Sequence, residues 1–362
     1  MPPLLDVRGL EKHYPVTEGI LKRQVGTVRA VDGVSFTLGP GETLGLVGES
    51  GCGKSTVATS LLRLEEPTGG QVRFDGEDVT AFDDRALKRF RREAQMVFQD
   101  PTSSFDPRMS VGESVTEALR VHGLSDRTRR RAVGEDLLER VGLSAADYDR
   151  YPHEFSGGQK QRAAIARALV VNPRLVVADE PVSALDVSVK SAVLDLLTDL
   201  QEEFGIAMVF ISHDLSVVRE VADRVAVMYL GEIVETAPTE RLFESPEHPY
   251  TEALLSAIPR PDPDAPGRTI RLTGTVPSAS APPAGCRFHT RCPKVVQPEG
   301  VDLPQDVWRR VLDARLRVRD DDVDVAAVRE LRAPDGADGT GLGADETVAA
   351  LRAEFDLPDE LS

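Results

Sequence analysis

The sequence predicts an α/β protein whose central sheet is mainly parallel. Short apolar runs, which are typical of buried strands, alternate with helical patterns from the start of the chain to about residue 240. Strands that alternate with helices are joined by right-handed crossovers, and such crossovers build a parallel sheet. A glycine-rich segment lies between an apolar strand and a helix at 48–55, and a wholly helical stretch follows later in the chain.

The predicted elements follow from hydrophobic periodicity. Strands are predicted at 4–10, 29–38, 42–48, 94–98, 174–179 and 206–212, a hairpin at 69–79, and further strands within 224–237. Helices are predicted at 54–64, 189–204 and 215–222. From Ser110 to about Arg150 the pattern is helical throughout, so a helical insertion, placed at about residues 100–170, interrupts the sheet.

The composition excludes several classes of protein. The 362 residues include 60 acidic and 43 basic residues, and the net charge of −17 disfavours a nucleic-acid binder or a direct anchor on anionic lipid. Three cysteines argue against a disulfide framework and for a reducing compartment. No signal peptide is visible, and no apolar run reaches the roughly 18 residues that span a bilayer. A cytosolic protein, held at a membrane only by partners, is expected.

The segment GESGCGKS (48–55), called here the phosphate loop, fits the pattern G-x-x-x-x-G-K-[ST] between a strand and a helix. Glycines let backbone N–H groups curl around phosphate oxygens, and the helix dipole adds positive potential. Lys54 is predicted to reach the outer phosphates, and the Ser55 hydroxyl to bind Mg²⁺. The predicted nucleotide-binding residues here are Gly48, Glu49, Ser50, Gly51, Cys52, Gly53, Lys54, Ser55 and Thr56.

Polar residues also follow three other predicted strands, at the edge where ligands of open α/β sheets bind. Asp179 is predicted to hold Mg²⁺, and Glu180 to act as general base toward the attacking water. His213 is predicted to orient the γ-phosphate, and Gln99 to reach Mg²⁺ or the water. Each is weak evidence alone, because polar residues commonly end buried strands, but behind a phosphate loop they indicate ATP hydrolysis.

A second glycine-containing helix start, Ser156–Gln159 (SGGQ), is called here the signature segment. It lies after the helical insertion, far in sequence from the phosphate loop, and has no obvious ligand in its own chain. We therefore expect Ser156, Gly157, Gly158 and Gln159 to meet a nucleotide that is held by a second, similar protein.

The order of these motifs resembles that of ATP-binding cassette ATPases over about residues 4–260. The matching motifs are Gly48–Ser55, Gln99, Ser156–Gln159, Leu175–Glu180, the segment SALD at 183–186, and His213; Phe155 departs from the usual leucine. The resemblance implies a P-loop NTPase cassette with a mainly parallel core, an antiparallel β subdomain, an inserted helical subdomain and a C-terminal extension. It also implies that two cassettes enclose two ATP molecules head to tail, that Asp186 lies at this interface, and that Tyr14 stacks on adenine.

Three longer segments, at 28–56, 97–113 and 228–259, look like the oligopeptide/dipeptide transporter ATPases. The long insert PVTEGILKRQVGTVRAVDGV and the linker IPRPDPD favour the F-type member over the D-type. This resemblance implies a D-type ATPase or a second copy as partner, two transmembrane permeases, an indirect link to a solute-binding protein, and a peripheral position at the cytoplasmic face of the cell membrane. It divides the chain into an ATP-binding domain (1–259), a C-terminal extension (260–300) and a partly flexible acidic tail (301–362).

Two questions stay open on the sequence alone. The extension begins like a cysteine cluster, but it has only Cys286 and Cys292 where an iron–sulfur cluster needs four ligands. Zinc on these two cysteines and His289 is an alternative with three visible ligands. For the function, peptide import is the leading hypothesis. A soluble cassette ATPase acting on ribosomes or DNA, and a non-hydrolysing scaffold, are disfavoured by the single uninterrupted cassette and by the presence of Glu180 and His213.

Overall fold

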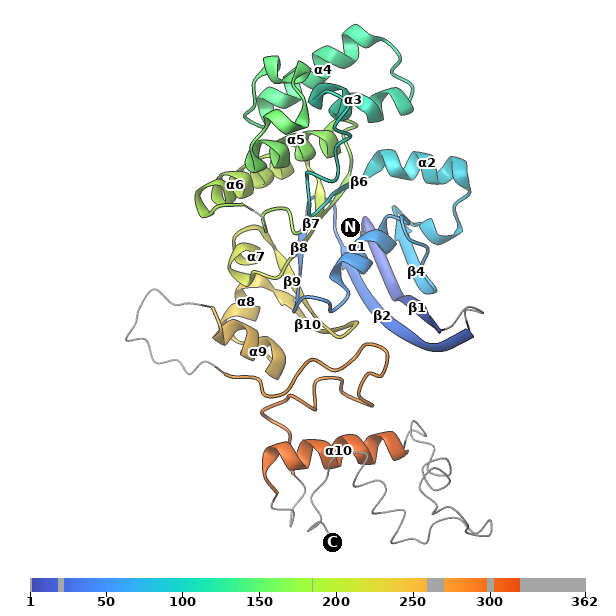
Figure 1. Cartoon of the computed structure of the whole chain (residues 1–362), viewed down its shortest axis with the longest axis vertical. Coiled ribbons are helices and arrows are strands. Elements are labelled where there is room, and N and C mark those ends of the chain that lie inside the picture. The colour runs from blue at the N-terminus through green and yellow to red at the C-terminus, as the bar shows by residue number, and fades with distance from the viewer. Residues whose placement is uncertain (1, 19–22, 184, 259–269, 298–302, 320–362) are drawn as a thin grey trace. The chain divides into compact units, whose positions relative to one another are not determined.

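The computed structural model describes residues 2–18, 23–183, 185–258, 270–297 and 303–319 (Figure 1). It divides into two compact units, Met1–Pro246 and Glu247–Ser362. The first unit contains two sheets and most of the helices, and the described residues of the second contain two helices.

A six-stranded sheet forms the core of the first unit. Its strands are, in order, β10 (Glu232–Pro238), β9 (Arg224–Tyr229), β3 (Thr43–Val47), β8 (Ala207–Ser212), β7 (Leu175–Asp179) and β6 (Ala94–Val97). Only β10 runs antiparallel to its neighbour, and the pairs from β9 to β6 are parallel. Every residue of β3, β7 and β8 is buried, as expected for strands with helices on both faces. The predicted parallel core is confirmed.

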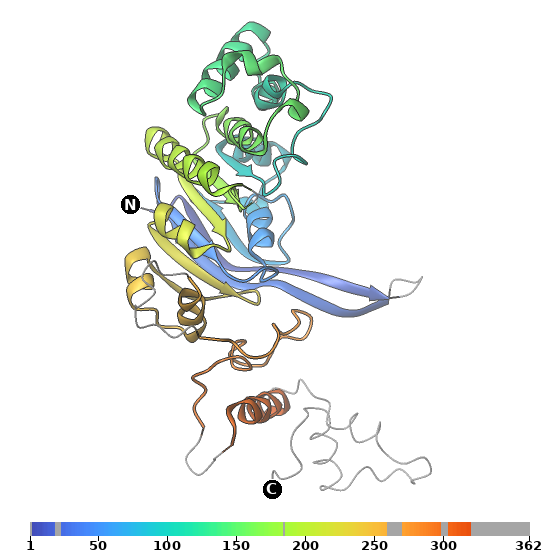
Figure 2. The ribbon, with the colours of Figure 1, turned by 60° about the vertical axis from the view of Figure 1, so that its left-hand side comes forward.

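A second sheet is antiparallel, with the order β2 (Arg23–Leu38), β1 (Leu5–Glu18), β4 (Gly69–Phe74) and β5 (Glu77–Asp78). The predicted hairpin at 69–79 corresponds to β4 and β5. Strands β1 and β2 are much longer than predicted, and they extend past the rest of the sheet as a two-stranded ribbon (Figure 2). Register shifts interrupt their pairing at four places, which explains why the sequence shows no regular alternation there.

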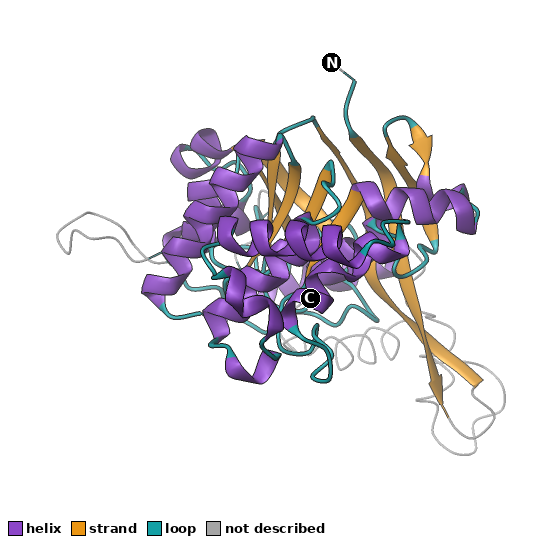
Figure 3. Ribbon diagram, turned by 90° about the horizontal axis from the view of Figure 1, so that it is seen from above, coloured by secondary structure: helices purple, strands orange, loops and turns teal. Residues whose placement is uncertain are grey.

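The helices of this unit are α1 (Lys54–Leu61), α2 (Asp84–Glu93), α3 (Val111–Val121), α4 (Arg127–Arg140), α5 (Gly157–Leu169), α6 (Val187–Phe204), α7 (Leu215–Val221) and α8 (Thr239–Glu244) (Figure 3). Short 3₁₀ turns lie at Val79–Ala81, Ala145–Asp149 and Pro152–Glu154. Helices α3, α4 and α5 contact one another and form the predicted helical insertion. Helix α2 was not predicted, because its apolar stripe is short: it consists of Ala86, Leu87 and Phe90, and only Phe90 is buried.

The second unit contains α9 (Pro249–Ser256) and α10 (Gln305–Arg319). The fully buried Tyr250 of α9 packs against Phe288, with 5.3 Å between the ring centroids. This contact places α9 with the later segment, within the compact unit that begins at Glu247. The boundary of the ATP-binding domain at residue 259 stays a prediction. Helix α10 was not predicted and lies in the segment assigned to the acidic tail. Residues 320–362, which include most of that tail, lie outside the described residues.

Candidate functional site

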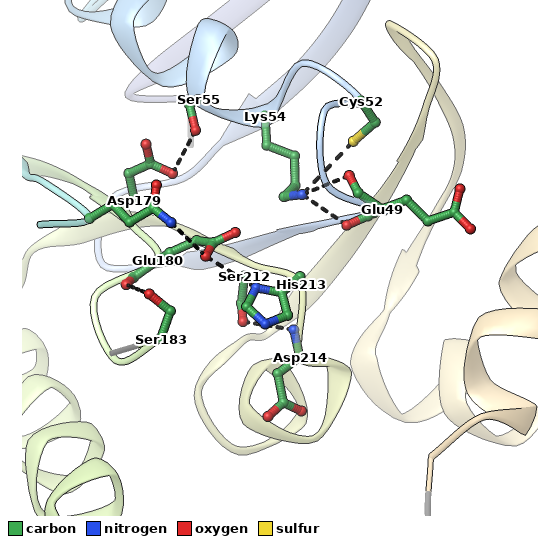
Figure 4. A network of polar contacts seen from close by, with 12 residues as sticks. Glu49, Cys52, Lys54, Ser55, Asp179, Glu180, Ser183, Ser212, His213 and Asp214 are labelled. Atoms are coloured by element: carbon green, nitrogen blue, oxygen red, sulfur yellow. Dashed lines mark hydrogen bonds and ion pairs between the residues drawn. The ribbon is translucent and has the colours of Figure 1, made fainter. Parts of the chain in front are cut away.

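The candidate site lies at one edge of the core sheet, where β3, β8, β7 and β6 all end. These four strands are neighbours and run parallel, so the segments that follow them emerge side by side. In the register, Val47 is opposite Ser212, and Asp179 is opposite Ile211. The topology therefore brings together residues of the phosphate loop, Asp179, Glu180 and His213 from separate parts of the sequence (Figure 4). Gln99, which follows β6, joins them through a hydrogen bond to Glu180.

The phosphate loop connects β3 to α1 through glycines that no other residue can replace without strain. Gly48 has φ 157° and Gly53 has φ 108°, both unfavourable for residues with a Cβ. A Cβ on Gly53 would lie 2.0 Å from the Ala30 carbonyl oxygen, and one on Gly48 would lie 2.2 Å from that of Met228. The chain's own backbone thus holds this loop in a compact turn.

Lys54 crosses the inside of this turn. Its side chain is buried, and Nζ donates hydrogen bonds to the carbonyl oxygens of Gly48, at 2.8 Å, and Glu49, at 3.0 Å. The Sγ atom of Cys52 lies 4.0 Å from the same nitrogen, and burial raises the pKa of this thiol. A buried ammonium held by carbonyl dipoles is placed to bind a group with full negative charge, such as a phosphate.

Ser55 and Asp179 form a pair of oxygen ligands beside Lys54. The Ser55 hydroxyl donates a hydrogen bond of 3.2 Å to Asp179 Oδ1. Burial raises the pKa of the Asp179 carboxyl, and the charge of Glu180 raises it further. The hydrogen bond from Ser55 and the charge of Lys54 lower it, but the net shift is upward. A hydroxyl and a buried carboxylate in contact are the oxygen donors that Mg²⁺ prefers, so these residues fit that ion.

Glu180 connects the two polar residues from the neighbouring strands. Its Oε2 accepts a hydrogen bond of 3.1 Å from Gln99 Nε2 and lies 3.1 Å from His213 Nδ1. Its backbone has φ 45°, a conformation that costs energy for a residue with a side chain. The turn is held by Ser183, whose hydroxyl and N–H both donate to the Glu180 carbonyl oxygen. His213 has 53% of its side chain exposed, so a ligand can reach it.

The signature segment begins α5 and is built differently. Ser156 and Gln159 form a reciprocal capping box, with each side chain bonded to the other's backbone N–H. Gly157 is exposed, with nothing closer than 4.0 Å to a Cβ placed on it, whereas a Cβ on Gly158 would lie 2.5 Å from Val189. Among the described residues, no hydrogen bond or ion pair joins this segment to the phosphate loop.

Two further predicted residues lie away from Glu180. Asp186 is exposed at the start of α6, where its carboxylate makes no capping hydrogen bond. Tyr14 lies on β1, and its hydroxyl contacts Thr56 in the first turn of α1 and donates a short hydrogen bond to Glu65. Two neighbours of Tyr14 were not predicted from the sequence: Glu65, and Lys12, whose Nζ lies 5.1 Å from the centre of the Tyr14 ring.

The C-terminal cysteines do not form a recognisable metal site. In the His289 ring, Nδ1 lies 2.7 Å from the Cys286 carbonyl oxygen and Nε2 lies 3.3 Å from Asp313 Oδ1. Within the described part of the chain, no three His, Cys, Asp or Glu residues are grouped so that they could hold a metal ion. The zinc alternative is therefore not supported there.

No helix in the described ranges combines the length and the apolar character that a membrane crossing requires.

Comparisons with known proteins agree with this geometry. The family model for ABC transporters matches residues 31–183, and the model for the C-terminal region of oligopeptide/dipeptide transporters matches residues 234–298. The oligopeptide transport ATP-binding protein AppF of Bacillus subtilis is 50% identical over 80% of this chain and 89% of its own length. The dipeptide transport ATP-binding protein DppF of Escherichia coli is 51% identical over 80% of this chain and 86% of its own length.

Among solved structures, a dimeric ATP-binding cassette in a post-hydrolysis state with ADP and Pi is similar. It has a TM-score of 0.58 and 30% identity, and the match covers 65% of this chain and 98% of the other. This likeness confirms the predicted cassette fold. The extent and identity of these matches show that the chain belongs to the ATP-binding proteins of the ABC transporter family, in the group that carries the oligopeptide/dipeptide transporter C-terminal region.

Proposed function

We propose that this chain is the subunit that binds and hydrolyses ATP to drive the import of di- or oligopeptides, or of related small solutes, through a membrane complex. The observation that carries the proposal is the position of Glu180, whose carboxylate contacts Gln99 and His213 beside the buried Lys54. The substrate class is supported by the names of the relatives and by the C-terminal region that the chain shares with oligopeptide/dipeptide transporters.

In this proposal the phosphate loop holds ATP, and Lys54 exchanges its carbonyl partners for the β- and γ-phosphate oxygens. Ser55 and Asp179, with Gln99, would hold Mg²⁺, which neutralises charge on the phosphates. Their fit to that ion rests on the 3.2 Å contact between the Ser55 hydroxyl and the buried Asp179 carboxylate. Thr56 lies one residue further along α1, on the side of the α-phosphate.

Glu180 would act as the general base. Its carboxylate takes a proton from the attacking water while the water oxygen bonds to the γ-phosphorus and the bond to the β-phosphate oxygen breaks, giving ADP and phosphate. Gln99 and His213 already contact this carboxylate, so they can hold it toward the water. The exposed His213 ring can also donate a hydrogen bond to the γ-phosphate.

Cassettes of this family form dimers, as the similar post-hydrolysis structure does. We infer that the signature segment and Asp186 complete the nucleotide site of a D-type ATPase subunit or of a second copy. The exposed Ser156 and Gly157 leave room for a phosphate from outside the chain, which is consistent with this arrangement.

The proposed contact with the membrane subunits is an open groove of ≈1020 Å³ between α2, β6 and α3. Apolar residues line it, among them Leu64, Phe98 and Val121, which are 40–50% exposed. In the sequence, the groove residue Phe98 directly precedes Gln99, and the groove residue Ser103 follows shortly after it. One permease would insert a cytoplasmic helix here, and the other would use the corresponding groove of the partner ATPase. This arrangement would put the chain at the cytoplasmic face of the membrane and link it indirectly to a solute-binding protein.

We also propose the division of labour expected from the sequence. Residues 1–259 act as the ATP-binding domain, 260–300 as the transporter-specific extension, and 301–362 as an acidic tail. The compact unit that begins at Glu247 joins α9 to the extension, so the functional and structural boundaries need not coincide.

The replacement Glu180→Gln tests the hydrolytic role in the complex reconstituted with its partner subunits. ATP binding should be retained, while turnover should fall by about a hundredfold or more, as for loss of a general base. The control is Glu202→Gln, which removes an exposed carboxylate from α6. Turnover above about a tenth of the wild-type rate would exclude Glu180 as the base.

The substrate class is tested by uptake into vesicles that contain the complete importer. ATP-dependent accumulation of labelled di- or oligopeptides is expected with the matching solute-binding protein. Accumulation of a sugar or of nickel, with no peptide uptake, would replace the peptide assignment while leaving the ATPase role intact.

A further inference from the structure

We propose that Lys12 and Glu65 are positioning residues that hold the Tyr14 ring ready to stack on the base of ATP. This inference rests on the proposed function, in which the phosphate loop binds ATP. It concerns only the base, so it can be tested separately from phosphate binding.

The ribbon formed by β1 and β2 places Tyr14 next to the phosphate loop. Gly53 lies directly against β2, because a Cβ placed on Gly53 would be 2.0 Å from the Ala30 carbonyl oxygen. Val28, which pairs with Tyr14, is two residues from Ala30 on the same strand, a rise of about 7 Å. The Tyr14 hydroxyl also contacts Thr56, at the start of α1. A nucleotide whose phosphates occupy the loop would therefore extend its base toward this ring.

Two groups fix the orientation of the Tyr14 ring. Its hydroxyl donates a short hydrogen bond to Glu65, and Thr59 lies 3.5 Å from the other oxygen of the same carboxylate. Lys12 lies on the same side of β1, two residues earlier, with Nζ 5.1 Å from the ring centroid. This distance is within the range of a cation–π interaction.

Lys12 is itself held in place. Its Nζ donates a hydrogen bond of 2.8 Å to the Glu66 carbonyl oxygen and lies 3.8 Å from Glu65 Oε2. Lys12 therefore covers one face of the Tyr14 ring. Among the residues that the structure describes, no other aromatic ring or cation is recorded against Tyr14, so the opposite face is left for a base.

The hydroxyl remains a donor under ordinary conditions. Burial raises the pKa of Tyr14, and the hydrogen bond and the charge of Glu65 raise it further. The hydrogen bond with Thr56 lowers the pKa, but the net shift is upward. A neutral hydroxyl keeps its bond to the Glu65 carboxylate at neutral and mildly alkaline pH. A ring fixed before the ligand arrives loses little rotational freedom on stacking, which favours affinity.

The test compares the binding of ATP and of inorganic tripolyphosphate by calorimetry, using the full chain. Tripolyphosphate occupies the phosphate loop without a base. Tyr14→Ala should weaken ATP binding by about tenfold, the usual scale for stacking of a base on an aromatic ring, and leave tripolyphosphate binding unchanged. Glu65→Ala and Lys12→Met should each weaken ATP binding by roughly threefold to fivefold, again without effect on tripolyphosphate.

Two further measurements separate positioning from a general structural role. In the Tyr14→Ala background, Glu65→Ala should cause no additional loss, because the ring that it positions is gone. Glu65→Gln, which keeps a hydrogen-bond acceptor, should restore most of the affinity for ATP.

The outcomes distinguish this inference from the proposed function. Equal losses for ATP and tripolyphosphate, or an undiminished effect of Glu65→Ala in the Tyr14→Ala background, would overturn the positioning role. A wild-type chain that binds neither compound would instead refute the ATP site itself, and the inference with it.

Discussion

The phosphate loop and the signature segment are both glycine-containing helix starts, but they are closed to different degrees. In the phosphate loop, the backbone around Ala30 and Met228 surrounds the glycines, and Lys54 fills the turn. In the signature segment, Gly157 faces open space, and no cation of the described chain is recorded inside the turn. The first is closed by its own chain, whereas the second is open at Gly157. We propose that the first holds phosphate and that the second meets a nucleotide that another molecule brings.

The two glycines of the signature segment also differ from each other. Neither has a positive φ, so backbone conformation does not require glycine at either position. Gly158 is required by close packing, because Val189 of α6 occupies the space of a side chain. A Cβ on Gly157 would have no such neighbour. The proposed approach of an external phosphate would explain why glycine stands at this position.

The largest effect is expected from Ser156→Arg, which fills the open start of α5. Turnover of the assembled complex should fall by about a hundredfold or more, because the bulk blocks closure on the nucleotide of the partner. ATP binding by the isolated chain should not change, since the phosphate loop and Tyr14 are intact. Both can be measured, as steady-state hydrolysis and as the ATP dissociation constant.

Ser156→Ala is the matched control, because it removes the same helix cap, worth about 1 kcal/mol, without adding bulk. If Ser156→Arg weakens ATP binding by the isolated chain, or if it impairs trapping of nucleotide at this chain's own Lys54, the signature segment acts within its own chain. The contrast between a closed and an open site would then fail.

Lys54→Ala should have the reverse pattern: it should weaken the binding of ATP by the isolated chain. Loss of a charged hydrogen-bond donor in a buried turn should raise the ATP dissociation constant by roughly tenfold to a hundredfold. Direct calorimetry checks this value, with Lys160→Ala, near the start of α5, as a control for general loss of positive charge. An unchanged dissociation constant would show that the loop does not cradle phosphate.

The packing difference between the two signature glycines predicts opposite stabilities. Gly158→Ala should lower the free energy of unfolding by about 1–3 kcal/mol, as for overpacking, since its Cβ would lie 2.5 Å from Val189 Cγ1. Gly157→Ala should keep or raise stability by up to about 1 kcal/mol, because alanine favours the helix. Denaturant unfolding measures both.

The double variant Gly158→Ala/Val189→Ala provides the internal check. Shortening Val189 should recover part of the stability, because it removes the clash. Equal destabilisation by Gly157→Ala and Gly158→Ala would mean that the signature segment is closed on both sides, contrary to the structure.

Much of the core and of the arrangement of the motifs could be predicted from the sequence. Buried parallel strands read as short apolar runs, and their carboxyl ends must share an edge, so Asp179, His213 and Gln99 were expected beside the phosphate loop. The structure brings them together. Their catalytic and metal-binding roles stay predictions.

What the sequence could not show depends on contacts between distant segments. The need for glycine at Gly158 comes from Val189, and the surroundings of Tyr14 come from Glu65, 51 residues away. Helix α2 has only a short apolar stripe, and the long ribbon lacks regular alternation because its register shifts. Periodicity records which face of an element is buried, but it does not record which residue covers that face.

The smallest expected effect is a dependence of cation binding on pH, which should arise at the phosphate loop and not at the signature segment. The phosphate loop lies beside the buried carboxylate of Asp179, whereas the signature segment contains no acidic residue. Burial raises the pKa of Asp179 above its ordinary value of 3.8, so this carboxyl takes up a proton at a higher pH than an exposed one does. A protonated Asp179 no longer attracts a divalent cation. Binding of Mn²⁺, used as a probe for Mg²⁺ in the presence of ATP, should therefore weaken progressively as the pH falls below neutral. Electron paramagnetic resonance of free Mn²⁺ gives the affinity at each pH.

Asp179→Asn should weaken binding at every pH and flatten the profile, while Asp195→Asn, at an exposed position of α6, should keep the wild-type profile. A profile that is unchanged in Asp179→Asn would assign the titration to another group, and the cation would then not be held at the closed site by this carboxylate.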